Sequence, residues 1–312
     1  MSTFSAWKTD NYKFVGKAFD FAYSNRLNML APIIGEVNSN SIDYELTGSG
    51  GYGEAPVYDG ENLNEGSLHR GFKTVITPVE YTISIPVGYK EAKIDKLGET
   101  NKVGTRLGDS MAMTVYLHVL RMFGNAWNKG RKGGDGESWA STAHPVASLG
   151  SSGRRHIPNP EAGTYSNSGN MAFSVGAITA AQANANRLVT PDGLPFLCQL
   201  DTVLIPPELE EKAKRMFGEN AKLLPGTNEN DANPVQGMKY MIVGGGNDGF
   251  GPKQWAICDK RLMKELTNIV YNTRPMVMES PQDNPLKDLY TAYADFGVGW
   301  ADARMIYFND PS

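Results

Sequence analysis

The sequence lacks the excess of basic residues that is typical of proteins built to hold nucleic acid. It contains 30 Lys and Arg against 34 Asp and Glu, which gives a formal net charge of -4. Affinity for a phosphate backbone comes from Lys and Arg side chains. We therefore expect any contact with nucleic acid to be weak and without sequence preference.

Cysteine and long apolar runs are also scarce. Cys198 and Cys258 are the only cysteines and form no CxxC pair, so a disulfide framework is excluded. We expect both to be small buried apolar residues in a reducing cytoplasm. The first residues lack the basic-then-apolar order of a signal peptide, and no uncharged apolar run approaches the roughly 18 residues that a membrane span needs. These absences predict a protein made and kept in the cytoplasm.

Catalytic and metal-binding motifs are missing as well. The four histidines, which are His69, His118, His144 and His156, form neither HExxH nor any other short ligand pair. His144 lies beside Pro145 and is the most enzyme-like of them, but we interpret it as a hydrogen-bonding surface residue. No Ser, Cys or Lys has an identifiable base partner. The sequence predicts no catalytic residue, no metal site and no cofactor, and hence no enzyme.

One glycine-rich stretch resembles a phosphate loop in position. Residues Gly244 to Gly249 read GGGNDG and follow a predicted strand. The stretch lacks the Lys-Ser/Thr of a P-loop and the spacing of a dinucleotide fingerprint, and no convincing helix follows it. We interpret it as a turn between strands. A small-ligand enzyme using this loop remains the alternative from another functional class.

Glycine is abundant, and it is concentrated in a segment from Thr47 to Gly71 that has little apolar content. This segment is expected to stand away from the globular body. Residues 73–88 then alternate, with one parity occupied by Val75, Val79, Tyr81, Ile83, Ile85 and Val87. The alternation predicts a long half-buried strand, and residues 41–46 are a plausible antiparallel partner. Together they predict a hairpin arm with a glycine-rich tip, whose unpaired edge suits a neighbouring molecule.

Two helices are expected in the first half of the chain. Residues 10–30 place Phe14, Ala18, Phe21 and Leu27 on one stripe. Residues 90–127 form the strongest candidate, with a stripe of Met111, Val115, Val119, Met122 and Ala126. Gly98, Gly104 and Gly108 weaken its first half by ~1 kcal/mol each relative to Ala.

The rest of the chain mixes helices and strands. Residues 129–170 are expected to form a surface loop. Helices are predicted at 177–188, 207–218 and 260–271, and strands at 195–205, 239–243, 253–258, 276–278, 289–296 and 305–308. No internal repeat is evident. Since the strands and helices do not alternate regularly, the expected fold class is α+β.

Two stretches resemble a known family. Residues 193–196 running into 200–210 (LDTVLIPPELE) are similar to the element by which the major capsid proteins of tailed bacteriophages enter a helix of the axial lobe. Residues 293–302 (YADFGVGWAD) resemble the aromatic and glycine-rich end of Mu-like head subunits. The resemblance implies the Hong Kong 97-type capsid fold. The implied layout is an N-terminal arm at 1–33, an extended β-hairpin loop with flanking strands at 34–90, a peripheral domain with a long spine helix at 91–140, a mixed α/β axial domain at 141–275, and a C-terminal return to the peripheral domain at 276–312.

The resemblance also implies a function. It predicts a non-enzymatic major capsid protein of the virion, assembled in the host cytoplasm into pentamers and hexamers of an icosahedral shell around double-stranded DNA. The expected partners are copies of the chain, a scaffolding protein, the portal and a decoration protein, with the packaged DNA held weakly. An encapsulin-like nanocompartment shell of the same fold is the alternative. Inter-subunit contacts are predicted on the extended loop, at Tyr52, Tyr58, Leu63, Leu68, Arg70 and Lys73. Cross-linking through Lys73 is not expected, because no catalytic Glu can be assigned.

Overall fold

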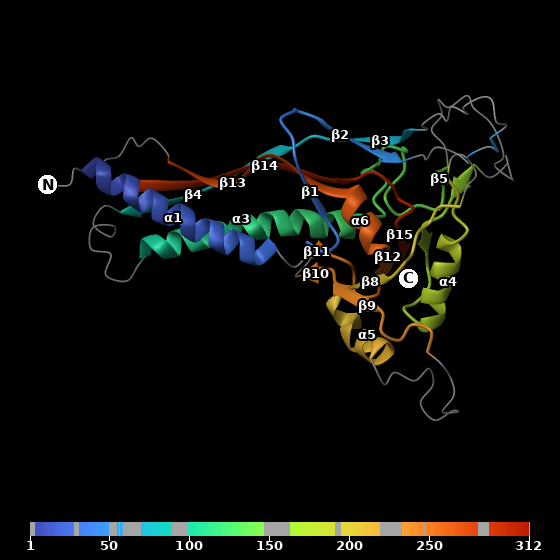
Figure 1. Cartoon of the computed structure of the whole chain (residues 1–312). Coiled ribbons are helices and arrows are strands. Elements are labelled where there is room, and N and C mark those ends of the chain that lie inside the picture. The colour runs from blue at the N-terminus through green and yellow to red at the C-terminus, as the bar shows by residue number, and fades with distance from the viewer. Residues whose placement is uncertain are drawn as a thin grey trace. The chain divides into compact units, whose positions relative to one another are not determined.

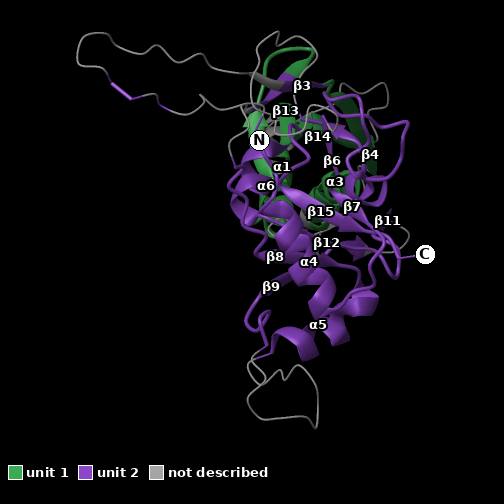
Figure 2. Cartoon of the chain, turned by 90° about the vertical axis from the view of Figure 1, so that its right-hand side faces the viewer, with its two compact units in different colours: residues 1–44, 76–119, 268–298 green, residues 45–75, 120–267, 299–312 purple. Residues whose placement is uncertain are grey.

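The computed structural model describes residues 4–27, 31–49, 55, 57–58, 70–88, 99–146, 163–190, 195–218, 233–245, 248–279 and 287–311. They divide into two compact units (Figure 2). Unit 1 contains residues 1–44, 76–119 and 268–298, and unit 2 contains residues 45–75, 120–267 and 299–312. Neither unit is a continuous piece of sequence, so each depends on contacts between distant segments.

Unit 1 consists of two long helices on one side of a four-stranded sheet (Figure 1). The sheet order is β1-β13-β14-β4, with β1 parallel to β13 and β4 antiparallel to β14. The elements are α1 (Phe4–Leu27), β1 (Gly35–Asn38), β4 (Val79–Gly88), α3 (Glu99–Gly124), β13 (Thr267–Glu279) and β14 (Lys287–Trp300). Unit 2 contains residues 120–124 of α3, the first residue of β13 (Thr267) and the last two residues of β14 (Gly299 and Trp300).

The two faces of this sheet differ in polarity. On the helix-covered face, the Tyr81 ring lies 4.8 Å from His118 of α3 and 4.7 Å from Phe296 of β14, measured between ring centroids. On the other face, cross-strand polar pairs include the hydroxyls of Ser84 and Thr291, 2.8 Å apart. The alternation in β4 therefore separates a packed face from a polar one, as the sequence predicted, although Val79 and Ile83 on this edge strand stay partly exposed.

The predicted buried stripe of α1 is wrong. Phe14 and Phe21 are 59% and 72% exposed. The buried stripe consists of Val15, Phe19 and Ala22, which recur at steps of four and three. The helix itself was predicted correctly, but the face assigned to the core lies about a quarter of a turn away from the true one, since neighbouring residues differ by about 100°.

The close approach of α3 explains which face of α1 is buried. A Cβ atom added at Gly104 would lie 2.5 Å from the carbonyl oxygen of Val15, and one added at Gly108 would lie 2.5 Å from that of Phe19. The two glycines thus allow the backbones of α1 and α3 to come into contact. This backbone contact decides which face of α1 turns toward α3, and its largest side chains do not. Since Gly104 meets Val15 and Gly108 meets Phe19, the two helices run in the same direction (Figure 1). The glycines that weaken α3 in isolation are the residues that allow α1 to pack on it.

The predicted stripe of α3 is confirmed. Every member is at most 2% exposed: Met111, Val115, Val119, Met122 and Ala126. Arg106 and Arg121, which lie elsewhere on the wheel, are exposed. None of the described helices is apolar over a long enough stretch to cross a membrane.

Unit 2 is built on a five-stranded mixed sheet of order β7-β15-β12-β8-β9. All residues of β8, β12 and β15 are buried, which makes these strands the centre of its core. The elements of this unit are β2 (Tyr44–Ser49), β3 (Arg70–Ile76), β5 (His144–Pro145), β6 (Thr164–Tyr165), β7 (Ser168–Gly169), α4 (Val175–Ala185), β8 (Thr202–Ile205), η1 (Pro207–Leu209), α5 (Glu210–Phe217), β9 (Lys239–Ile242), β10 (Gly244–Gly245), β11 (Asp248–Gly249), β12 (Trp255–Cys258), α6 (Lys260–Leu266) and β15 (Ile306–Asn309).

The single strand predicted at 73–88 is divided into β3 and β4. The division falls at Thr77 and Pro78, and a proline cannot donate to a sheet ladder. Within β3 the buried parity is reversed: Thr74 and Ile76 are buried, whereas Val75 is 52% exposed. Val75 was therefore wrongly assigned to the packed face. The partner strand β2 begins a few residues later than predicted and forms a separate two-stranded sheet with β3.

Two further predictions need correction. The segment after α3 is not all surface loop, because Trp139 and His144 are completely buried and β5 pairs with β6. The helix predicted at 260–271 ends at Leu266, where β13 begins. Thr267 and Tyr271 are buried in that strand, as suits a β-branched and an aromatic residue. The helix start predicted at Pro207 is confirmed, with α5 continuing to a C-cap at Gly218.

Candidate functional site

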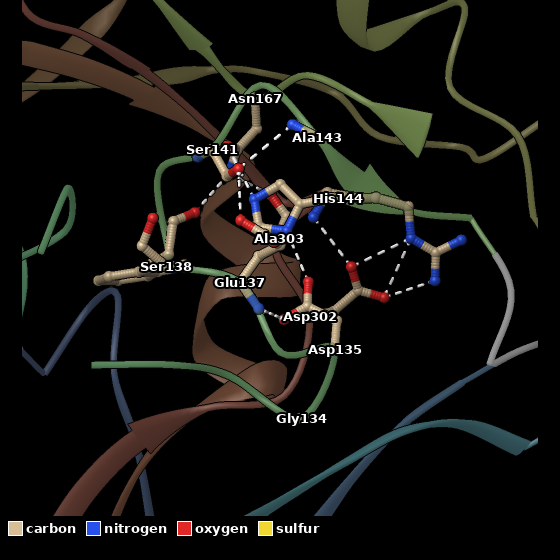
Figure 3. A network of polar contacts seen from close by, with 12 residues as sticks. Gly134, Asp135, Glu137, Ser138, Ser141, Ala143, His144, Asn167, Asp302 and Ala303 are labelled. Atoms are coloured by element: carbon tan, nitrogen blue, oxygen red, sulfur yellow. Dashed lines mark hydrogen bonds and ion pairs between the residues drawn. The ribbon is translucent and has the colours of Figure 1, made fainter. Parts of the chain in front are cut away.

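A cluster of buried polar side chains is the most enzyme-like feature of unit 2 (Figure 3). We call it the polar junction, and its members are Asp135, His144, Asn167, Asp302 and Arg304. They come from three stretches that are far apart in sequence. His144, Asn167 and Arg304 are each at most 6% exposed, so their polar atoms must find partners within the protein.

Asn167 is the centre of the polar junction. Its Nδ2 donates to the carbonyl oxygens of Trp139 at 2.8 Å and Ala303 at 3.0 Å. Its Oδ1 accepts from the backbone N–H of Ser141 at 3.0 Å and faces Nε2 of His144 at 3.1 Å. All donors and acceptors of this amide are used, so Asn167 joins three segments of unit 2.

Both ring nitrogens of His144 have polar partners in this geometry. Its Nε2 lies 3.1 Å from Oδ1 of Asn167. On the other side of the ring, Nδ1 lies 2.5 Å from Oδ2 of Asp135. The two contacts hold the imidazole ring in one orientation between the two side chains.

Arg304 and Asp302 form a second buried ion pair at this junction. The Nε of Arg304 lies 3.0 and 3.1 Å from the two carboxylate oxygens of Asp302. Its guanidinium stacks over the Phe196 ring at 4.4 Å from the centroid. Burial acts to lower the pKa of Arg304, but the charge of Asp302 and its hydrogen bonds outweigh burial and raise the pKa above the usual value. Arg304 is therefore a permanently charged anchor.

The polar junction resembles a catalytic triad only in part. The Asp135–His144 pair resembles two of its members, but the remaining nitrogen of His144 contacts an amide oxygen instead of a nucleophile. The Ser141 hydroxyl donates to Glu137 at 3.0 Å. The adjoining cavity, lined by Asp135, Asp302 and Arg304 among others, has a volume of about 20 Å³, which is room for about one water molecule. The hydrogen bonds and ion pairs of the junction therefore hold the loops of unit 2 together.

The described ends of the stretch from Gly244 to Gly249 lie in two short paired strands, as suits the predicted turn between strands, whose residues 246–247 lie outside the described chain. β10 and β11 pair antiparallel, with Gly244 opposite Gly249. Gly249 has φ of +94°, and a Cβ at Gly124 would lie 2.5 Å from its carbonyl oxygen. Arg121 also bonds Asp248 at 3.0 Å. The hairpin is thus packed on the end of α3 and leads to strand β12 rather than to a helix, which removes the basis for a phosphate-binding loop.

Within the described part of the chain, no three His, Cys, Asp or Glu residues come together to hold a metal ion. Both cysteines are buried and free, as the sequence predicted. Burial, followed by the nearby charge of Asp259, raises the pKa of Cys198 to about 12. A thiol with so high a pKa is a poor nucleophile at neutral pH, because the thiolate is the reactive form.

The predicted inter-subunit residues are only partly within the described chain. Tyr52, Leu63 and Leu68 lie outside it, as does the side chain of Arg70. Tyr58 is 59% exposed, and Lys73 is exposed and forms an ion pair with Glu45. Since most of the set lies outside the described residues, the predicted contact set stays a prediction.

Sequence analysis missed several exposed apolar side chains. Val57 beside Tyr58 is 93% exposed, and Val75 on β3 is half exposed. In unit 1, Phe14 and Phe21 of α1 and Met113 of α3 are exposed although they sit on helices with an apolar stripe. The exposure of Phe14 and Phe21 could not be predicted from the apolar stripe of α1 alone, because the buried face of this helix is set by its contact with the glycines of α3.

Comparison with known proteins identifies the fold. No protein-family model matches the sequence, and no curated protein matches it either. Solved structures do match. The capsid of a native GTA particle has a TM-score of 0.54 and 11% identity, covering 91% of this chain and 89% of that one. The capsid of cyanophage P-SCSP1u gives 0.54 and 10%, covering 89% and 86%. A virus-like particle from Pyrococcus furiosus gives 0.52 and 9%, covering 96% and 99%. The chain therefore has the α+β fold of phage capsid proteins that its sequence resemblance predicted.

Proposed function

We propose that this chain is the major capsid protein of a tailed bacteriophage, which assembles into the pentamers and hexamers of an icosahedral shell around double-stranded DNA. The observation that carries the proposal is the extent of the match to the GTA capsid, which covers 91% of this chain and 89% of that one. The proposal includes a non-enzymatic role, in which the chain acts by contacting copies of itself.

The proposed layout assigns a role to each segment. Residues 1–33 are the N-terminal arm and contain α1. Residues 34–90 hold the extended loop and its flanking strands, and 91–140 hold α3 as the spine helix of the peripheral domain. At 26 residues, α3 is about 39 Å long, which suits the role of a long spine helix. The axial domain at 141–275 contains β8, β9 and β12 of the five-stranded sheet, and 276–312 return to the peripheral domain.

The extended loop is proposed to make the contacts between subunits, through Tyr52, Tyr58, Leu63, Leu68, Arg70 and Lys73. The described part of this region supports the proposal, because Val57 and Tyr58 are 93% and 59% exposed. Such side chains gain by burial against a neighbour. Each contact is modest, but a subunit held by several neighbours at once gains avidity.

The remaining partners follow from a shell of this kind. A scaffolding protein, a portal and a decoration protein are proposed, and the capsid is placed in the virion after assembly in the host cytoplasm. The net charge of -4 supports weak, sequence-independent contact with packaged DNA.

A nanocompartment shell of the same fold is the second candidate. The observation behind this candidate is the match to the virus-like particle from Pyrococcus furiosus, whose chain is matched over 99% of its length. The match to the capsid of cyanophage P-SCSP1u supports the phage shell instead. The contents of purified particles separate the two candidates. Nuclease-protected double-stranded DNA supports the phage shell, whereas a co-purifying enzyme without DNA supports the nanocompartment.

Size-exclusion chromatography and sedimentation of the expressed full-length chain test the proposal. With its scaffolding partner or a crowding agent, the chain is expected to move from subunits to large particles of uniform size. A chain that stays monomeric under all these conditions and turns over a metabolite contradicts the proposal.

A further inference from the structure

Unit 1 has an open, mostly apolar groove between α1 and α3. Its volume is about 460 Å³. Ala22 and Ala112, which are both buried, form its floor. Its lining residues are Phe21, Ala22 and Asn25 of α1 and Thr105, Asp109, Ala112, Met113 and Tyr116 of α3. The groove exists because small residues occupy the floor while large ones stand at the sides.

The size and direction of the groove fit a helix. The lining residues of α3 run from Thr105 to Tyr116, which corresponds to about 17 Å or three turns. The two helices that form its walls run in the same direction, and a third helix packs well between such ridges. Helix-in-groove recognition uses apolar anchors spaced at i, i+3, i+4 and i+7. The ring of Phe21 is 72% exposed and Met113 38%, so both can contact such anchors.

The charge around the groove favours an acidic partner. The described side chains of residues 12–25 and 102–119 carry four cations, Lys13, Lys17, Lys102 and Arg106, against two carboxylates, Asp20 and Asp109, which is a local net charge of +2. The whole chain has the opposite sign, at -4. The one charged residue that lines the groove is Asp109. Lys17 lies one turn before Phe21, and Arg106 lies one turn before Asp109, so these two cations lie on the same helix faces next to the lining residues. Complementary charge steers encounter and fixes orientation.

Tyr116 adds a specific polar group. Burial raises the pKa of this half-buried tyrosine, so its hydroxyl keeps its proton at all physiological pH values. A protonated phenol in an apolar groove can donate to a carboxylate or carbonyl oxygen of the occupant.

We propose that the groove between α1 and α3 binds an amphipathic helix of a separate protein, with an apolar stripe on the groove floor and acidic residues beside Lys17 and Arg106. Packaged DNA is a poorer occupant, because the apolar floor and the Phe21 ring contribute nothing to phosphate binding. The inference goes beyond shell formation, and its test on unassembled subunits does not depend on whether shells form.

The test measures binding of a labelled synthetic peptide to the full-length chain by fluorescence anisotropy, at concentrations where the chain is unassembled. The probe is a peptide of about 18 residues, five turns of helix, with Leu on one face and Glu on its flanks. The comparison peptide has Lys in place of Glu. We expect the Glu peptide to bind roughly tenfold more tightly or better, and F21S to weaken it by a similar factor.

Ile42→Ser is the control, because Ile42 is an exposed apolar residue of unit 1 that belongs to neither helix of the groove. It is expected to leave binding unchanged. Equal binding of both peptides, or equal effects of F21S and I42S, overturns the proposal. It also fails if F21S abolishes self-association of the chain without affecting the peptide, since the occupant is then a second copy.

Discussion

Replacing Gly108 by alanine separates the effect of helix propensity from that of packing. In the interior of an isolated helix this change stabilises by ~1 kcal/mol. In unit 1, however, the added Cβ atom would lie 2.5 Å from the carbonyl oxygen of Phe19 and 3.0 Å from the Cβ of Ala22. Ordinary contact begins at 3.4 Å, so α1 has to retreat by about 0.9 Å. Overpacking of this kind costs ~1–3 kcal/mol, because a backbone oxygen cannot rotate away.

We therefore expect Gly108→Ala to lower the free energy of unfolding by up to ~2 kcal/mol after the propensity gain is included. The assay is urea denaturation of unassembled subunits followed by circular dichroism. Gly16→Ala is the matched control, since a Cβ at Gly16 of α1 has nothing within 4 Å, and it should stabilise by ~1 kcal/mol. If both variants stabilise equally, α1 does not pack on α3 through its backbone and the account of unit 1 is wrong.

Three further outcomes are expected. His144→Ala should lower the free energy of unfolding by ~3 kcal/mol in the same assay, because it empties a buried site and removes the partner of Asp135 Oδ2, which leaves this largely buried carboxylate with its bond to the Glu137 N–H. A loss below ~1 kcal/mol would mean that the polar junction does not hold unit 2 together. Cys198 should react with a thiol reagent far more slowly in the native chain than in urea, because burial raises its pKa from the ordinary 9.0 to about 12; equal labelling rates would contradict its burial. Because the pKa is higher in the folded chain than in the unfolded one, the free energy of unfolding should also fall as the pH rises above 9.0. Deleting residues 50–68, which lie between β2 and β3, should preserve the circular dichroism spectrum but prevent particles from forming in sedimentation; an unfolded deletion variant would mean that the segment serves its own subunit.

The parts of the fold that could be predicted depend on local periodicity. The stripe of α3 was predicted because Met111, Val115 and Val119 report a single face that is buried on its own sheet. The start of η1, which continues into α5, was predicted because Pro207 fixes the backbone at a first helical position. Both signals lie within one element, so no knowledge of distant segments was needed.

The missed parts depend on contacts between segments far apart in sequence. The buried face of α1 is set by Gly104 and Gly108, more than 80 residues further along the chain. The burial of His144 depends on Asn167. Neither contact can be predicted from the neighbouring sequence, because a glycine or a histidine looks the same there whether it lies in an exposed loop or in a packed contact. Most of the predicted inter-subunit residues lie outside the described chain, so that surface remains a prediction.

Cryo-electron microscopy of particles formed by the full-length chain tests the central claim most directly. The account predicts closed shells with fivefold and sixfold rings of subunits. In each subunit of these shells, the segment between β2 and β3 should lie on a neighbouring copy. Isolated subunits or small open oligomers under every assembly condition, with that segment folded onto its own subunit, would contradict the claim that this capsid fold serves as a shell.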